Sequence, residues 1–201
     1  MSSSDSHLIS ALIALEKCSP KLVKSSVYPA PAEPTTLVRS WKMNEFKYYD
    51  IPSPFPTYAR GLFTIGDRIV VRGYDKFFNI GEVPWTQVSN SLLSFNSHSL
   101  NHFQWSFLES HTRSPYILSL KSNGCIIFIA ALSSSKLVVT SKHSLGSVTG
   151  QGLAHAVAGD AWLKRYLEQK EKTEADLAKH LWDNNWTAVA EVRVVAVFCA
   201  F

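Results

Sequence analysis

Cysteines, long apolar runs and clustered metal ligands are all scarce in this chain of 201 residues. The 3 cysteines, Cys18, Cys125 and Cys199, form no Cys-x-x-Cys pair and have no metal-ligand spacing. We therefore expect reduced thiols in an intracellular protein, located in the nucleus or the cytoplasm. No segment approaches the ~20 apolar residues that a membrane-spanning helix needs, so we expect no membrane span.

The histidines give no indication of a metal site either. His98, His102 and His111 lie close together in the sequence, but their spacing is irregular and no cysteine or carboxylate joins them. A protein-bound metal normally needs several such ligands at regular spacing. We therefore predict no metal site made of protein side chains alone.

The composition is that of an ordinary globular domain. Hydrophobic residues make up 46% of the chain and charged residues 18%, which suits a single domain with a continuous core and no disulfides. The formal net charge is +4. A basic excess favours a polyanionic partner such as nucleic acid, although many proteins of this charge bind none.

Two apolar segments joined by a serine-rich connection predict a β-hairpin. The first runs from Cys125 to Leu132, the connection is Ser133–Ser135, and the second segment is centred on Val138–Thr140. In an antiparallel pair the start of one strand lies opposite the end of the next. Lys121 and Lys142 are therefore expected at the same rim of the sheet.

Lys121 is the strongest candidate for a nucleophile. It precedes an Asn123-Gly124 turn, where glycine can adopt a positive φ and allow a ligand to approach the backbone. A neighbouring cation and partial burial would each lower the pKa of a lysine, which makes its amine nucleophilic near neutral pH. The alternative is an unrelated β-rich interaction module in which Lys121 is an ordinary turn residue.

The N-terminal third is predicted to be loosely organised. A mobile leader over residues 1–6 precedes a short amphipathic helix near residues 8–15. Several prolines then predict a linker or a wrapped arm up to residue 36. Farther along, Gly66-Asp67 between two apolar runs predicts a tight hairpin.

The C-terminal third has a helical period. Apolar residues recur at three- to four-residue spacing from about residue 150, with charged residues mostly outside that face. The capping-box pattern Thr173–Asp176 predicts the start of another helix that ends at Asn184-Asn185. A strand beginning at Trp186 and ending at Glu191 is predicted to follow.

Three aromatic rings and a lysine cluster at Tyr74–Phe78. The cluster can be a strand end whose rings belong to the core. It can equally be a platform on which a base stacks while Lys76 faces a phosphate.

The motifs and their order resemble a known family. Lys-x-Asn-Gly is similar to the motif Lys-x-(Asp/Asn)-Gly of the nucleotidyltransferases that adenylylate a lysine, which are RNA ligases, DNA ligases and capping enzymes. Its neighbours are SWKMNEFKYYDIPSPFPTYARGLFT, VRGYDKFFNIGEVPWT, LKSNGCIIFIAAL and SKHSLG. Together they resemble the N-terminal ligase domain of fungal tRNA ligases, a branch of the phage-type RNA ligases.

The resemblance implies an ATP site. Lys121 would be the catalytic lysine, the aromatic ring of Phe78 would line the adenosine pocket, and Glu191 would contact the ribose. Further ATP-binding residues that it implies are Arg60, Lys76, Asn123, Gly124 and Lys142.

The resemblance also implies a fold and a domain division. The fold class is α+β, an antiparallel-sheet nucleotidyltransferase core with helices packed on the sheets, incomplete at the C-terminus. Residues 1–36 would be the leader, helix and linker, residues 37–191 the partial ligase domain, and residues 192–201 an apolar tail unlike the family.

Two motifs of the family are missing after Glu191. The chain contains no Glu-Gly pair, and its Lys-x-Lys, Lys170-Glu171-Lys172, precedes Glu191 instead of following it. We therefore expect these 201 residues to adenylylate themselves slowly or not at all.

The implied function is that of an ATP-dependent RNA ligase of tRNA splicing. Lys121 would form lysyl-AMP with ATP and Mg²⁺, and the AMP would pass to the 5′-phosphate of RNA, here tRNA halves with a healed 3′ end. The protein is expected to be a monomer. The alternative is an inactive remnant that at most binds ATP or RNA.

Overall fold

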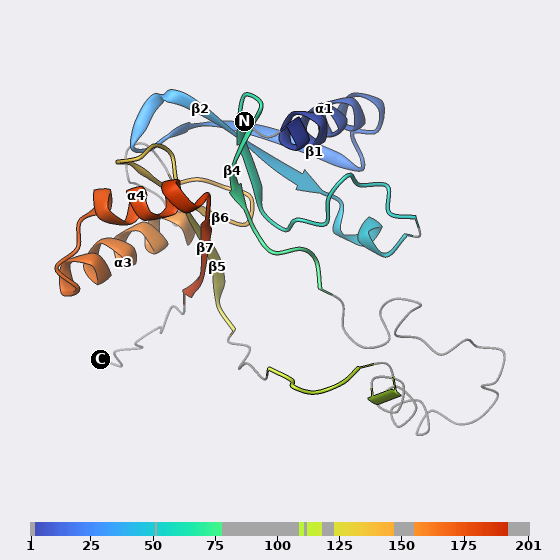
Figure 1. The fold of residues 1–201 in the computed structure, drawn as a ribbon. Coiled ribbons are helices and arrows are strands. Elements are labelled where there is room, and N and C mark those ends of the chain that lie inside the picture. Colours follow the sequence, from blue (N-terminus) through green and yellow to red (C-terminus); the bar gives the residue numbers. More distant parts are fainter. Residues whose placement is uncertain are drawn as a thin grey trace, which may run out of the picture.

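Two antiparallel sheets, each covered on its outer face by helices, make up the computed structural model (Figure 1). The structure describes residues 3–50, 52–77, 109–110, 112–117, 123–146 and 155–192. Helices and antiparallel sheets together confirm the predicted α+β class.

The first sheet has the strand order β1-β2-β3-β4 and the second has the order β6-β5-β7. The strands are β1 (Val23–Ala30), β2 (Glu33–Met43), β3 (Leu62–Ile65), β4 (Arg68–Arg72), β5 (Cys125–Ala131), β6 (Leu137–Ser141) and β7 (Thr187–Val192). The helices are α1 (Ser3–Cys18), the 3-10 helix η1 (Glu45–Tyr49), α3 (His155–Gln169) and α4 (Glu174–Asn184). None of the described helices combines the length and apolarity needed to cross a bilayer.

The central strand β5 is buried on both faces. Phe128 and Ala130 point into the core between the two sheets, together with residues of β2, β3, β4 and β6. Ile127 and Ile129 point the other way, onto α3 and α4. This alternation follows from the two-residue period of a strand and explains the uninterrupted apolar run in its sequence.

Helix α1 covers the outer face of the first sheet. Ile9 and Leu12 are buried against Val23 of β1, Trp41 of β2 and Leu62 of β3. The helix begins at Ser3, so residues 3–6 of the predicted leader belong to α1, which is longer than the predicted helix near residues 8–15. Burial of one apolar stripe against the sheet stabilises the first turn of α1. The same residues in an isolated peptide would not form that turn stably.

The segment up to residue 36, predicted as a linker or a wrapped arm, instead carries strand structure, because β1 and β2 pair through it. The prolines fall where a missing N–H does little harm. Pro29 adjoins the register shift between Pro29 and Ala30, and Pro34 has no partner in the β1–β2 register. Strand β1 is an edge strand, and edges and bulges are where sheets tolerate proline.

Several other predicted elements are confirmed. β5 and β6 form the expected hairpin, and β3 and β4 flank Gly66-Asp67. Thr173 caps α4 in a reciprocal capping box with Asp176, and Asn185 ends that helix in the left-handed conformation. The expected strand before Glu191 is β7, which pairs with β5. Residues 87–113, whose Ser/Asn/His-rich sequence with interspersed apolar residues predicts short helices and loops over one sheet face, lie almost entirely outside the described residues.

Candidate active site

Arg60 and Lys76 are carried by two hydrogen-bonded segments that extend the β3–β4 hairpin. The Arg60 amide donates to Tyr74 O at 2.9 Å, and the Lys76 amide donates to Tyr58 O at 2.7 Å. The Gly73 amide donates to Gly61 O at 2.7 Å. This ladder fixes the backbones of the two predicted ATP-binding cations relative to each other.

Gly61 and Gly73 allow the ladder to rest on the core. A Cβ built at Gly61, whose φ is +89°, would lie 2.3 Å from Cε2 of Phe128. A Cβ at Gly73 would lie 2.0 Å from Arg60 O. Both distances are far below van der Waals contact, so only glycine permits this approach of the Arg60 backbone to the ring of Phe128.

Glu45 gathers three basic side chains from distant parts of the chain. Its carboxylate accepts a hydrogen bond from Lys142 Nζ and lies 3.5 Å from Arg60 Nη2 and 3.8 Å from His143 Nε2. The carboxylate comes from η1, Arg60 from the segment before β3, and Lys142 and His143 from the end of β6. The cluster joins the rims of both sheets.

The charges in this cluster shift the pKa values of two groups. Partial burial opposes ionisation of Glu45, but the hydrogen bond and charge of Lys142, with the charges of Arg60 and His143, hold the Glu45 pKa below its usual value. The His143 pKa is also lowered, first by burial and then by the charges of Lys142 and Lys42. Near neutral pH the site therefore contains an ionised Glu45 carboxylate beside a neutral His143 imidazole.

Two polar atoms of the cluster are buried and have no hydrogen-bond partner among the described residues. They are Nε of Arg60 and Nδ1 of His143. Leaving a buried polar atom unsatisfied costs ~1–3 kcal/mol. These atoms are therefore suited to a polar ligand or to ordered water.

Lys76 lies apart from the Glu45 cluster. Its ammonium donates to Phe77 O and stands 5.2 Å from the centre of the Tyr49 ring. Tyr74 and Phe77 are 72% and 59% exposed, so these two rings are not part of the core. Phe78 lies outside the described residues, and its place at the adenosine pocket stays a prediction.

The start of β5 and the end of β7 bring Asn123, Gly124 and Glu191 into one region. A Cβ at Gly124 would lie 2.6 Å from Val192 O and 3.1 Å from Cγ of Glu191. The turn that follows the candidate nucleophile therefore packs directly against the end of β7.

The predicted placement of Lys121 and Lys142 at the same rim of the sheet is not tested, because residues 118–122 lie outside the described part of the chain. Ile127 is the register partner of Ser141. The start of β5 thus lies opposite the end of β6, as the sequence predicted.

Comparison with known proteins identifies the family. A model of the T4-type RNA ligase family, described as RNA ligase, matches residues 58–197. This chain belongs to the RNA ligase family. All predicted site residues of this RNA ligase family member, from Arg60 to Glu191, fall inside the matched range.

Two curated fungal proteins are similar to this RNA ligase family member. "tRNA ligase 1" of Schizosaccharomyces pombe is 42% identical over 190 residues, which cover 85% of this chain and 22% of the relative. "tRNA ligase" of Candida albicans is 37% identical over 170 residues, covering 76% of this chain and 18% of the relative. The chain thus spans about a fifth of the length of these relatives, and its resemblance to fungal tRNA ligases is confirmed.

The sequence alone does not mark Glu45 or His143 as site residues. Glu45 stands in the run SWKMNEFKYYD, where nothing indicates that it meets Lys142, 97 positions away. It also lies before the range matched by the RNA ligase family. His143 follows Lys142 directly, and this adjacency was the one available signal.

Proposed function

We propose that this chain is the ATP-dependent adenylyltransferase unit of a tRNA-splicing RNA ligase. It forms lysyl-AMP on Lys121 and passes the AMP to an RNA 5′-phosphate. The observation that carries the proposal is the Glu45 cluster, which collects Arg60 and Lys142 at the rim where β5 begins, in a member of the RNA ligase family.

The chemistry follows from these charges. The unprotonated amine of Lys121 attacks the α-phosphorus of ATP, a phosphorus–nitrogen bond forms, and the bond to the pyrophosphate oxygen breaks. Negative charge grows on phosphate oxygens, and preorganised cations stabilise it because they need no rearrangement at that moment. Arg60, Lys76 and Lys142 supply that charge, and Glu45 orients two of them.

The donor set fits a triphosphate. Arg60 Nε is a buried donor without a partner in the described structure, and guanidinium groups match phosphate oxygens well. Mg²⁺, when bound with ATP, neutralises phosphate charge and is held mainly by the phosphates and one or two carboxylates. Glu191, whose implied role is a contact with the ribose, approaches the Asn123-Gly124 turn.

The second candidate function is an inactive remnant that binds ATP or RNA. The observation in its favour concerns these 201 residues alone, which contain no Glu-Gly pair and carry their Lys-x-Lys pair before Glu191 while spanning about a fifth of the length of the relatives. Loss of one preorganised charge stabiliser costs ~3 kcal/mol of barrier. The two candidates therefore differ in the rate of adenylylation and not in nucleotide binding.

The test is covalent labelling of the chain with ATP carrying a radiolabelled α-phosphate, in Mg²⁺ and over a long incubation. We expect a slowly formed, acid-labile label on Lys121 that Lys121→Ala and Lys121→Arg abolish. Lys136→Ala is the matched control, because Lys136 lies in the β5–β6 connection at the opposite end of the hairpin. A labelled Lys121→Ala protein contradicts the assignment, whereas ATP binding without any label supports the inactive remnant.

A further inference from the structure

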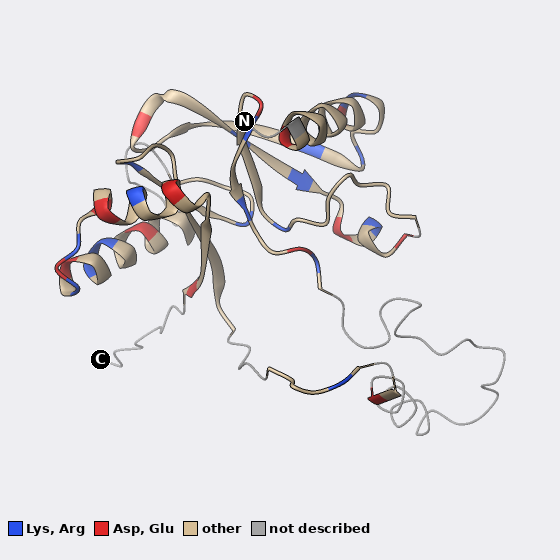
Figure 2. Cartoon of the chain, in the orientation of Figure 1, with Lys and Arg blue, Asp and Glu red and all other residues tan. Residues whose placement is uncertain are grey.

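A basic groove lies beside the Glu45 cluster, at the start of β1 and the end of β2, next to η1. Its volume is about 510 Å³. Four lysines line it: Lys21 after α1, Lys24 in β1, Lys42 in β2 and Lys76 after β4. Figure 2 shows basic positions along these ends of β1 and β2.

The groove contains little compensating negative charge. Among the described residues that line it, the one carboxylate is that of Glu45, which already pairs with Lys142 and Arg60. Lys21, Lys24 and Lys42 are exposed and form no ion pair with a carboxylate of the described residues. The groove therefore presents a concentrated positive charge to solvent.

Two of these lysines lie directly opposite each other in the sheet, an arrangement that destabilises the folded state. Lys24 and Lys42 are direct register partners in the antiparallel β1–β2 pair. Like charges directly opposite each other destabilise a sheet. Folding gains nothing from this pair, but a bound anion would gain from both charges.

Aromatic rings accompany the lysines. Phe46 of η1 lines the groove and is 84% exposed. The Tyr49 ring stands beside the ammonium of Lys76. An exposed ring beside a row of cations is the combination that binds single-stranded nucleic acid, because a base stacks on the ring while the ammonium groups follow the phosphates.

From these observations we infer that the groove binds the phosphodiester backbone of single-stranded RNA, with one base stacked on Phe46. Glu45 and Lys76 belong both to the groove and to the candidate active site. The groove therefore leads the RNA strand to the place where its end reacts. This inference rests on the proposed function, because it states where the RNA substrate of that reaction lies.

The test measures fluorescence anisotropy of a labelled single-stranded oligoribonucleotide of about 16 nucleotides with the chain in the absence of ATP, over a range of salt concentrations. Lys24→Gln/Lys42→Gln should weaken binding at least tenfold. It should also reduce the slope of log K against log salt by about 1.4, because each phosphate that a lysine no longer neutralises changes the slope by about 0.7. Phe46→Ala should weaken binding about tenfold and leave the slope unchanged.

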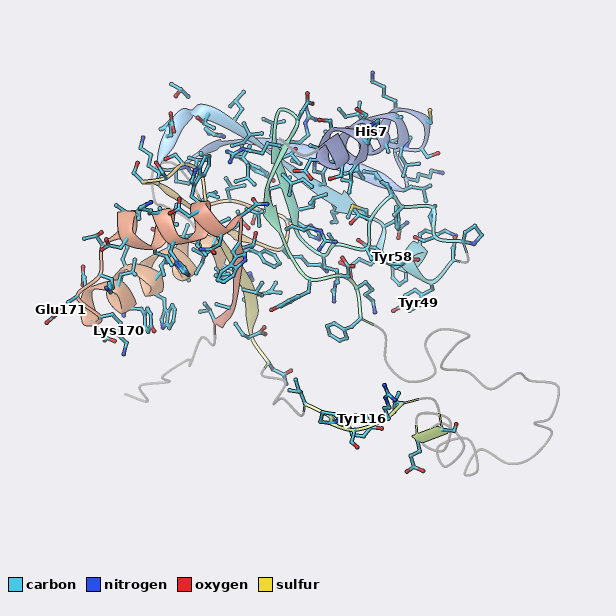
Figure 3. All side chains as sticks on the ribbon, in the orientation of Figure 1. His7, Tyr49, Tyr58, Tyr116, Lys170 and Glu171 are labelled. Atoms are coloured by element: carbon cyan, nitrogen blue, oxygen red, sulfur yellow. The ribbon has the colours of Figure 1, made fainter. Side chains whose placement is uncertain are left out.

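The matched control is Lys170→Gln/Lys172→Gln, which removes the same charge from the exposed turn after α3. Figure 3 shows Lys170 far from Tyr49 of the groove. This control should bind RNA with unchanged slope and nearly unchanged affinity. Urea midpoints of all variants should match or exceed that of the unchanged chain, which shows that weaker binding does not come from unfolding.

Three outcomes overturn the inference: an unchanged salt slope in Lys24→Gln/Lys42→Gln, an equal loss of affinity in the α3 control, or equal binding of an RNA duplex. Lysyl-AMP formation by the unchanged chain, measured separately, reports on the proposed function. If RNA binding depends on the groove lysines but the chain never forms lysyl-AMP, the RNA-binding role of the groove is supported and the proposed ligase function is contradicted. If lysyl-AMP forms but RNA binding does not depend on the groove lysines, only the RNA-binding role of the groove is contradicted.

Discussion

Replacing Gly61 by alanine should disturb both the core and the candidate site. Gly61 has a φ of +89°, and its added Cβ would lie 2.3 Å from Cε2 and 2.6 Å from Cζ of Phe128. Phe128 is fully buried between the two sheets, so its ring cannot turn out into solvent to make room for the methyl group. The ladder that carries Arg60 must therefore shift away from the core.

The expected magnitude has two parts. An alanine at positive φ costs ~1–2 kcal/mol because its Cβ crowds the backbone. Overpacking a closed core costs a further ~1–3 kcal/mol. The free energy of unfolding should therefore fall by about 2–5 kcal/mol, of which the larger share reflects the clash with Phe128.

Gly66 offers a matched control for the assay. Its φ is +53°, and a Cβ there would meet nothing within 4 Å. Gly66→Ala should therefore show only the backbone part, ~1–2 kcal/mol. Urea unfolding of both variants, followed by circular dichroism, separates the two parts as the difference between their unfolding free energies.

A double variant tests the packing itself. In a Phe128→Leu background, Gly61→Ala should lower the unfolding free energy by much less than it does in the unchanged chain. The smaller leucine side chain leaves room for the added methyl group and removes most of the overpacking part of the loss. Equal destabilisation by Gly61→Ala and Gly66→Ala, or additive effects with Phe128→Leu, would refute the close packing of the ladder on the core.

Three further predictions concern the site. Glu45→Gln should lower the unfolding free energy at pH 7 by less than about 1 kcal/mol, since its ion pairs are partly exposed. The difference in stability between the unchanged chain and Glu45→Gln should shrink as the pH falls below 4.5 and disappear once the pH is below the lowered Glu45 pKa of the folded protein. Urea midpoints at several pH values measure this. With a lowered His143 pKa the unfolded chain binds the proton more readily, so stability should fall as pH drops below 6.5, and His143→Gln should flatten that part of the profile. Phe78→Ala should weaken ATP binding about tenfold in calorimetric titrations and leave the thermal midpoint nearly unchanged, if its ring stacks on the base.

Local patterns predicted the elements that are stabilised locally. The capping box of α4 and the β5–β6 hairpin could be predicted because the residues that stabilise them are neighbours in sequence. The β1–β2 hairpin could not, because its prolines argue against strands until the bulge and the edge position are known. Helix α1 was predicted too short because its burial depends on three strands that follow it.

The candidate site shows the same division. Arg60, Lys76, Lys142 and Glu191 could be selected by resemblance, because each stands in a recognisable motif. Glu45 could not, because its role depends on two ion pairs made only when the sheets come together. A single acid in a mixed sequence gives no sign of a distant partner.

Phe128 links the core of the fold to the chemistry of the site. Its strand, β5, starts just after the Asn123-Gly124 turn. Its ring packs against Gly61 and Gly73, one on each of the two hydrogen-bonded segments of the ladder that carries Arg60. A change at this ring should therefore move Arg60 relative to that turn as well as lower stability. Because the Glu45 ion pairs are weak, they cannot hold Arg60 in place once the ladder shifts. Nucleotide affinity should consequently follow the integrity of this packing more closely than it follows the presence of the Glu45 charge.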